Sequence, residues 1–269
     1  MADSPLGQPT HYPEHYDPGL LHPIPRAAQR SRIGLTAELP FRGVDVWNAY
    51  ELSWLNRQGL PQVALGQFVF DCASPNIIES KSFKLYLNSL NQERFGSIED
   101  LRQCLQQDLS AAAGSSTAVT LAGLDSKLPI VEPVGVCLDS LDVSIEHYEP
   151  DSALLQFASQ SQAELSVYSN LFRSNCPITQ QPDWATVCIR YRGQEIAPES
   201  LLAYLVSYRL HNGYHEDCVE KIYTDIARVC RPEALTVQAN FLRRGGLEIN
   251  PIRSSSTIDE SSCFRFIRQ

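Results

Sequence analysis

The stretch "DWATVCIRYRG", from Asp183 to Gly193, decides the fold because its apolar side chains alternate. Val187, Ile189 and Tyr191 fall on one face of an extended chain, separated by single residues of the opposite face. Such alternation is typical of a strand with one buried face, which is usual in antiparallel sheets. We therefore expect a strand here, in a sheet that is covered on one side.

Two helices are predicted after this strand. "PESLLAYLVSYRLH" begins with Pro198, which suits the first turn of a helix. "HEDCVEKIYTDIARVC" places apolar residues at helical spacing, namely Val219, Ile222, Ile226 and Val229. Further strands are expected in "AELSVYSNLF" before Asp183, and in "EALTVQANFLRRGG" and "SSCFRFIRQ" after the helices.

The first half of the chain has a similar order of elements. "VDVWNAYELSWLN" and "PQVALGQFVFDC" are β-rich runs joined by the turn-like "RQGL", and "STAVTLAGL" is a later strand. Between them, two helices are predicted from the apolar spacing in "ESKSFKLYLNSLN" and "SIEDLRQCLQQDL". Ser97 is the expected N-cap of the second. Their apolar stripes are Phe83, Leu87 and Leu90, then Ile98, Leu101, Leu105 and Leu109.

This repeated order predicts a tandem duplication in a protein of the α+β class. We expect an N-terminal arm over residues 1–40, a first module over 41–150 and a second module over 151–269. The arm is rich in Pro, His and Tyr and is predicted to be extended. The segment 125–150, rich in Asp, Pro and Gly, is expected to link the modules and to carry the last strand of the first.

Composition narrows the possible partners. The 269 residues have a formal net charge of −9, so a long nucleic-acid interface, which needs clustered Lys and Arg, is not expected. No apolar run approaches the ~20 residues that span a bilayer, and the first residues do not resemble a signal peptide. Eight cysteines without a CxxC pair resemble neither a disulfide framework nor a zinc ribbon. We expect a cytoplasmic protein.

"SNCPITQQPDW", from Ser174 to Trp184, places a thiol in a stretch with few core-forming residues. Cys176 is either an ordinary structural cysteine or a nucleophile. The second interpretation is favoured because Pro177 stiffens the connection and a short hairpin would return Asp183 to the thiol, where a carboxylate can relay protons. The cysteines at 104, 188 and 218 fit apolar patterns and are expected in the core.

Two more stretches each have a structural and a functional interpretation. In "HNGYHEDC", Glu216 is either an acid at a helix start or an acceptor for a guanine-like edge, with His215 holding the substrate or moving a proton. "ESKSFKLY" is either a polar helix start or an anion site, formed by helix N–H groups, hydroxyls and an ammonium, for a nucleotide phosphate. "RRGG", from Arg243 to Gly246, is a similar phosphate candidate.

Four blocks resemble those of the QueF nitrile reductases, the NADPH-dependent 7-cyano-7-deazaguanine reductase family. They are "ESKSFKLYLNSLNQERF", "SNCPITQQPDW", "YHEDCVEKI" and "RRGGLEINPIR", in the family's order. The resemblance runs from about Leu20 to the C-terminus and is to the longer, two-module form. It implies tandem tunnelling-fold (T-fold) modules, each a four-stranded antiparallel sheet backed by two helices. It also implies reduction of the nitrile of 7-cyano-7-deazaguanine to an aminomethyl group with two NADPH, during queuosine biosynthesis for tRNA.

The resemblance also implies roles for individual residues. Cys176 would attack the nitrile to form a covalent thioimide, and Asp183 would deliver protons. The deazaguanine would be bound by Ile78, Glu79, Ser80, His215 and Glu216. NADPH would be contacted by Ser80, Lys81, Arg244 and Gly245. No metal is implied.

Other functions are considered beside the reductase. A zinc enzyme of the GTP cyclohydrolase type would use Cys176, His211 and His215 as ligands. A thiol hydrolase would add water to a nitrile, and a non-catalytic module would only bind. The expected partners are a small base and a second copy of the chain, since open sheet edges commonly close by association; neither a membrane nor direct nucleic-acid binding is expected.

Overall fold

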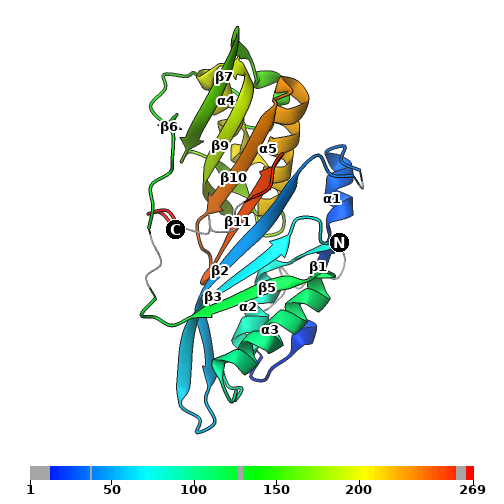
Figure 1. The fold of residues 1–269 in the computed structure, drawn as a ribbon, viewed down its shortest axis with the longest axis vertical. Coiled ribbons are helices and arrows are strands. Elements are labelled where there is room, and N and C mark those ends of the chain that lie inside the picture. Colours follow the sequence, from blue (N-terminus) through cyan, green and yellow to red (C-terminus); the bar gives the residue numbers. More distant parts are fainter. Residues whose placement is uncertain (1–12, 37, 127–129, 259–264) are drawn as a thin grey trace. The chain divides into compact units, whose positions relative to one another are not determined.

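Strands and paired helices form two units in the computed structural model, which describes residues 13–36, 38–126, 130–258 and 265–269 (Figure 1). Unit 1 takes its described residues from three ranges, Met1–Thr36, Asp45–Leu128 and Arg243–Glu248. Unit 2 takes them from Ala37–Val44, Pro129–Leu242 and Ile249–Gln269. The predicted α+β class is confirmed. Among the described residues, no helix combines the length and the apolar character that a membrane crossing requires.

The sheet of unit 1 is built on β2 (Arg42–Leu55), β3 (Pro61–Asp71) and β5 (Thr117–Ala122). β5 runs antiparallel to β3, with Phe70 opposite Thr117. The turn between β2 and β3 is closed by a backbone hydrogen bond from Asn56 to Leu60. The three predicted strands of this half are therefore confirmed.

Two helices of unit 1, α2 (Ser80–Ser89) and α3 (Ile98–Ala113), lie near each other (Figure 1). Their predicted stripes are buried except for Ile98, which is 43% exposed because it opens α3, beyond the face that packs. The Ser97 side chain caps α3 by accepting a hydrogen bond from the Asp100 amide, as predicted.

The arm contains regular elements that its composition did not predict. They are a 3₁₀ helix (Pro18–Leu20), β1 (Pro23–Pro25) and α1 (Arg26–Arg32). These pieces are too short for a periodic pattern to be visible in the sequence. β1 pairs with β4 (Asn76–Ile78), and the Tyr16 hydroxyl donates to Asp108 on α3 at 2.8 Å.

The main strands of unit 2 are β7 (Phe157–Ser169), β9 (Pro182–Ile196), β10 (Ala234–Phe241) and β11 (Leu247–Ser254), which begins in unit 1. β9 pairs antiparallel with both β7 and β10, and β10 with β11.

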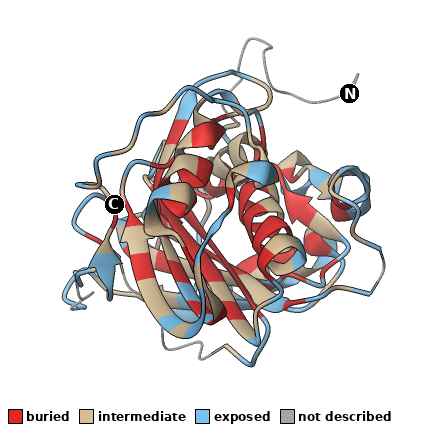
Figure 2. Ribbon diagram, turned by 90° about the horizontal axis from the view of Figure 1, so that it is seen from above, coloured by how far each residue is buried: buried red, intermediate tan, exposed pale blue. Residues whose placement is uncertain are grey.

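α4 (Pro198–Val206), a 3₁₀ helix (Ser207–Leu210) and α5 (His215–Cys230) complete unit 2. α5 packs against β9 and β10. The apolar row of β9, with Val187, Ile189 and Tyr191, is buried as predicted. Figure 2 shows that buried residues gather where helices and strands meet.

Two predictions about strands were wrong. Within 125–150, the described strand is β6 (Val136–Cys137), which pairs with β7 of unit 2 and does not complete the first module. "SSCFRFIRQ" is not a strand over its described residues 265–269, which form an isolated bridge and a turn; residues 261–264 lie outside the described part. Among the described residues, the last strand is β11, in which every residue is buried, so no alternation marks it.

Candidate functional site

The Cys176 hairpin, residues 173–184, is formed by β8 (Arg173–Asn175) and the start of β9. Ser174 pairs with Asp183, so the strand carrying Asp183 returns beside the chain that leads to the thiol. The turn is closed by hydrogen bonds from the Cys176 amide to the Gln181 carbonyl (2.9 Å) and from the Gln180 amide to the Cys176 carbonyl (3.0 Å). The predicted hairpin is confirmed, and it holds Cys176 half-buried.

This hairpin is tied to the segment that precedes α5. The Asn175 amide donates to the His211 carbonyl at 2.8 Å, and the Gly213 amide donates to the Asn175 carbonyl at 3.1 Å. The Arg173 guanidinium donates to the Asn175 side chain at 3.0 Å. Since α5 begins at His215, these bonds fix the start of that helix relative to the thiol loop.

Asp183 ends the core-facing row of β9. Its carboxylate is only 4% exposed, and its Oδ2 lies 3.4 Å from Nε2 of His215 in the first turn of α5. On its face, the His215 ring stacks on Phe241 with ring centroids 3.8 Å apart and planes 8° apart. Sequence analysis missed Phe241, although it closes the buried alternation of β10. The predicted pair Asp183 and His215 is thus brought together.

Glu216 is buried beside His215 in the first turn of α5. The N-cap of this helix is Tyr214, whose side chain makes no capping hydrogen bond. A carboxylate here lies at the positive end of the helix macrodipole.

Burial raises the pKa of four other thiols, Cys104, Cys188, Cys218 and Cys230. Burial raises the pKa of Cys188 to about 12 and that of Cys230 to about 11. Burial raises the pKa of Cys218 further, and also raises that of Cys104. These groups are thiols at neutral pH and are poor nucleophiles. Cys104 and Cys188 are half-buried, so only Cys218 of the three predicted core cysteines is fully buried.

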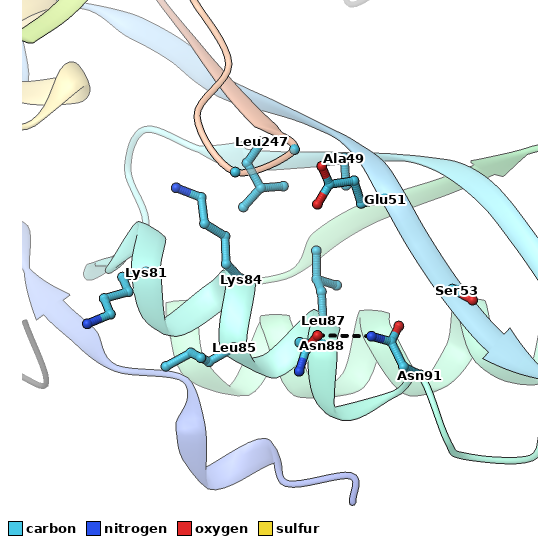
Figure 3. A pocket seen from close by; sticks show the side chains of 12 residues that line it. Ala49, Glu51, Ser53, Lys81, Lys84, Leu85, Leu87, Asn88, Asn91 and Leu247 are labelled. Atoms are coloured by element: carbon cyan, nitrogen blue, oxygen red, sulfur yellow. Dashed lines mark hydrogen bonds between the residues drawn. The ribbon is translucent and has the colours of Figure 1, made fainter. Parts of the chain in front are cut away.

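Unit 1 contains a cavity of about 500 Å³ between α2, β2 and the turn at Gly245 and Gly246 (Figure 3). Lys81 and Lys84 of α2 line it together with Glu51 of β2. Its remaining lining residues are Ala49, Ser53, Leu85, Leu87, Asn88, Asn91 and Leu247. Two ammonium groups, amides and exposed glycine backbone form a suitable lining for an anionic, polyhydroxylated ligand.

The glycine turn is held against β2 by hydrogen bonds to Tyr50. The Tyr50 amide donates to the Gly246 carbonyl at 2.9 Å, and the Tyr50 hydroxyl donates to Glu248 at 2.8 Å. Gly246 has φ +73°, and a Cβ there would lie 2.5 Å from the Glu51 carboxyl carbon. Only glycine suits this position, which belongs to the predicted phosphate candidate "RRGG".

The predicted anion site at the start of α2 is wrong in one respect. The Glu79 carboxylate caps α2 itself, accepting from the amides of Lys81 (2.8 Å) and Ser82 (2.7 Å). The Ser82 hydroxyl in turn donates to the Glu79 carbonyl. These helix N–H groups already have a carboxylate partner, so phosphate recognition here would fall to the lysine side chains.

The structure places the other predicted residues of unit 1 as follows. Lys81 and Gly245 line the cavity, whereas Ser80 and Arg244 are not among its lining residues. Ile78 is buried in β4, opposite Pro23 of β1. Lys84 and Glu51 line the cavity but were missed, although Lys84 stands one helical turn after Ser80 and Lys81 in the same motif.

The zinc alternative required Cys176, His211 and His215 to come together. Across residues 13–36, 38–126, 130–258 and 265–269, no three His, Cys, Asp or Glu side chains are grouped as a metal site.

The predicted site residues are divided between the two units. Unit 2 contains Cys176, Asp183, His215 and Glu216, and unit 1 contains Ile78, Glu79, Ser80, Lys81, Arg244 and Gly245.

Comparison with known proteins identifies the family. Residues 12–121 match the family model described as nitrile reductase, 7-cyano-7-deazaguanine-reductase N-term, and residues 182–260 match that of QueF-like protein. A protein of Dechloromonas aromatica named NADPH-dependent 7-cyano-7-deazaguanine reductase is 52% identical over 269 residues, 99% of this chain and 95% of that protein. The chain belongs to the 7-cyano-7-deazaguanine reductase family.

Other members of this reductase family are similarly close. Proteins with the same name from Bordetella pertussis and Saccharophagus degradans are each 51% identical, covering 95% of this chain and 94% and 95% of those proteins. Among solved structures, the archaeosine synthase QueF-Like in the apo form matches 38% of this chain and 99% of its own, with 21% identity and a TM-score of 0.32.

One prediction concerns His211, whose carbonyl anchors the hairpin of this reductase. Burial, and secondarily Lys221, lower the pKa of its imidazole below the ordinary 6.5, so the folded state disfavours the proton that the unfolded state accepts. The free energy of unfolding should therefore fall as the pH drops below about 6.5. His211→Gln should reduce the dependence of the free energy of unfolding on pH, measured by urea titrations at pH 7.5, 6.5 and 5.5. His147 is exposed, so His147→Gln is the control. The prediction is contradicted if the free energy of unfolding depends on pH equally in the unmodified protein and in both variants.

Proposed function

We propose that this family member reduces the nitrile of 7-cyano-7-deazaguanine to a primary amine through a covalent bond to Cys176. The observation that carries the proposal is the Cys176 hairpin, which pairs the strand leading to the thiol with the strand carrying a buried Asp183 beside His215. A thiol, a carboxylic group and an imidazole are the groups that addition to a nitrile and its protonation require.

The first step adds the Cys176 thiol across the carbon–nitrogen triple bond. The sulfur bonds to the nitrile carbon, the nitrogen takes up one proton, and nothing leaves, so the product is a thioimide. This species is a better hydride acceptor than the nitrile, and it splits one difficult reduction into easier steps.

Asp183 supplies the proton to the nitrile nitrogen, and His215 replenishes it. Asp183 is nearly inaccessible to water, and Nε2 of the His215 imidazole lies 3.4 Å from its carboxylate oxygen. Proton transfer by a positioned group of this kind contributes roughly 10²–10⁴-fold to rates.

Glu216 recognises the base. A buried carboxylate can accept two parallel N–H bonds from the ring nitrogen and exocyclic amine of a guanine-like edge. The roles of Ile78, Glu79 and Ser80 in binding the base rest on the family resemblance.

The cavity of unit 1 is the proposed binding site of NADPH. Lys81, Lys84 and the backbone at Gly245 would hold its phosphates, and Glu51 would accept from a sugar hydroxyl. Ser80 and Arg244 are retained as further contacts on the basis of the resemblance. Two NADPH molecules, bound in turn, would each supply one hydride. The carbon–sulfur bond to Cys176 would break after the first hydride has been added, which regenerates the thiol, and with two protons taken up the nitrile becomes an aminomethyl group. We also propose that the enzyme works in the cytoplasm, where its thiol stays reduced.

A homodimer is proposed from the outer edge of unit 2. β7 has thirteen residues, and the described strand on its outer side, β6, pairs through only two of them. Open edges of this kind commonly associate with another chain. Sedimentation equilibrium at micromolar concentration should give twice the chain mass, and a single-chain mass would contradict the proposal.

The covalent step is tested by mass spectrometry without NADPH. Intact protein incubated with 7-cyano-7-deazaguanine should gain one whole substrate mass, which peptide mapping should place on Cys176. Cys176→Ala should form no adduct while still binding the base non-covalently. Asp183→Asn should form it slowly, and its turnover should fall by ~10²-fold or more.

Cys188→Ala is the matched control, since the raised pKa of its thiol makes it a poor nucleophile. It should form the adduct at the normal rate. An adduct on another cysteine, or turnover by Cys176→Ala, would refute the assignment.

The cofactor cavity is tested with Gly246→Ala. The left-handed conformation is strained for alanine, and its Cβ would displace Glu51, so the KM for NADPH should rise roughly tenfold, which corresponds to about 1.4 kcal/mol. Gly34→Ala is the control, since its φ is +77° but no atom lies within 4 Å of the new Cβ. If both variants, or neither, raise the KM, the cavity is not where NADPH binds.

A further inference from the structure

The His215 ring is held mainly by its face. Phe241 is fully buried and stacks on it, with ring centroids 3.8 Å apart and ring planes inclined by 8°. On the edge of the ring, the contact between Nε2 and Asp183 is long, at 3.4 Å. Nδ1 is buried and has no hydrogen-bond partner among the described residues. The orientation of the imidazole toward Asp183 therefore depends on the flat surface below it.

Strand pairing sets where that surface lies. Phe241 is the last residue of β10 and pairs with Ala185 of β9, two residues after Asp183 and on the same face. The Leu242 amide donates to the Trp184 carbonyl at 2.9 Å and extends the pairing. Phe241 and the carboxylate are thus carried by adjacent strands, although 58 residues separate them in the sequence.

Gln269 fixes the end of β10 through its own side chain. Its buried amide nitrogen donates to the Phe241 carbonyl (3.2 Å) and to Asn250 Oδ1 (2.7 Å). Its amide oxygen accepts from Asn240 Nδ2 (3.1 Å) and from the Phe266 amide (2.9 Å). Both donors and the acceptor of the side chain are used, so Gln269 bonds the end of β10 to β11.

We infer that Phe241 and Gln269 are positioning residues for proton transfer. Phe241 holds the His215 imidazole at the Asp183 carboxylate, and Gln269 acts through Phe241 by fixing the backbone below the ring. Neither residue touches the reacting atoms. The inference rests on the proposed function only in that Asp183 and His215 move the proton.

The stacking itself is tested by NMR of the protein without substrate or NADPH. Protons above the face of an aromatic ring are shielded, so the His215 ring protons, assigned with His215→Gln, should resonate upfield. Phe241→Leu keeps an apolar side chain but removes the flat face, and the upfield shift should disappear. Phe241→Tyr restores a ring and should restore the shift.

Kinetics distinguish positioning from general support. In Phe241→Leu, kcat should fall on the order of tenfold, as part of the contribution of general acid–base catalysis is lost, while the KM for NADPH stays within about twofold. Phe241→Tyr should regain most of the kcat. Phe172→Leu is the matched control. Phe172 is as buried as Phe241, and its ring packs edge-on against that of Phe241 with ring centroids 6.0 Å apart. It should change neither the His215 resonances nor the kcat.

Gln269→Met tests the second residue. It preserves the length of the side chain and removes its hydrogen bonds, so it should reduce the upfield shift and the kcat in part. The neighbouring Arg268→Met, which loses only a bond to the Asn170 carbonyl, is its control and should change neither.

The inference is overturned if Phe241→Leu leaves the His215 shift or the kcat as in the unmodified protein, or if Phe172→Leu lowers the kcat equally. For Gln269, it is overturned if Gln269→Met behaves like Arg268→Met. Because the NMR measurement needs neither substrate nor adduct, its result does not depend on whether Cys176 forms the thioimide.

Discussion

The antiparallel pairing of β9 with β10 is the constraint on which the rest of the candidate site depends. Eight residue pairs, from Arg192 with Ala234 to Ala185 with Phe241, lock the register. A slip by one residue would place Asp183 and Phe241 on opposite faces of the sheet, so that only one of them could face α5. This ladder sets Phe241, on which His215 of α5 stacks, beside Asp183, and the same strand β9 pairs with β8 to form the Cys176 hairpin.

The fold was largely predictable because its elements are amphipathic. Alternation located β9, and helical spacing located α2, α3 and α5, since each buries one face. β11 escaped prediction because all eight of its residues are buried and Pro251 and Asn250 interrupt the apolar pattern. Ile98 was misplaced because periodicity does not reveal where a packed face ends.

The site was predictable where chemistry is local in sequence. The hairpin that returns Asp183 toward Cys176 follows from eleven consecutive residues. The stacking of His215 on Phe241 joins α5 to the end of β10, and no local pattern carries that information. The helix N–H groups of the predicted anion site were wrongly assigned, because Glu79, one residue before the helix, satisfies the amides that a phosphate would have used. A cap and a ligand site have the same composition and differ only in geometry.

The carboxylate of Glu51 in a cavity with two lysines changes how ionic strength acts on this protein. The cavity lining carries a formal charge of only about +1, in a chain whose formal net charge is −9. An anionic ligand is repelled at long range and attracted only within roughly a Debye length, about 8 Å at physiological salt. Added salt screens both the long-range repulsion and the short-range attraction. These two effects change the rate of ligand association in opposite directions. Association should therefore respond to salt far less than it does at strongly basic sites, where steering dominates.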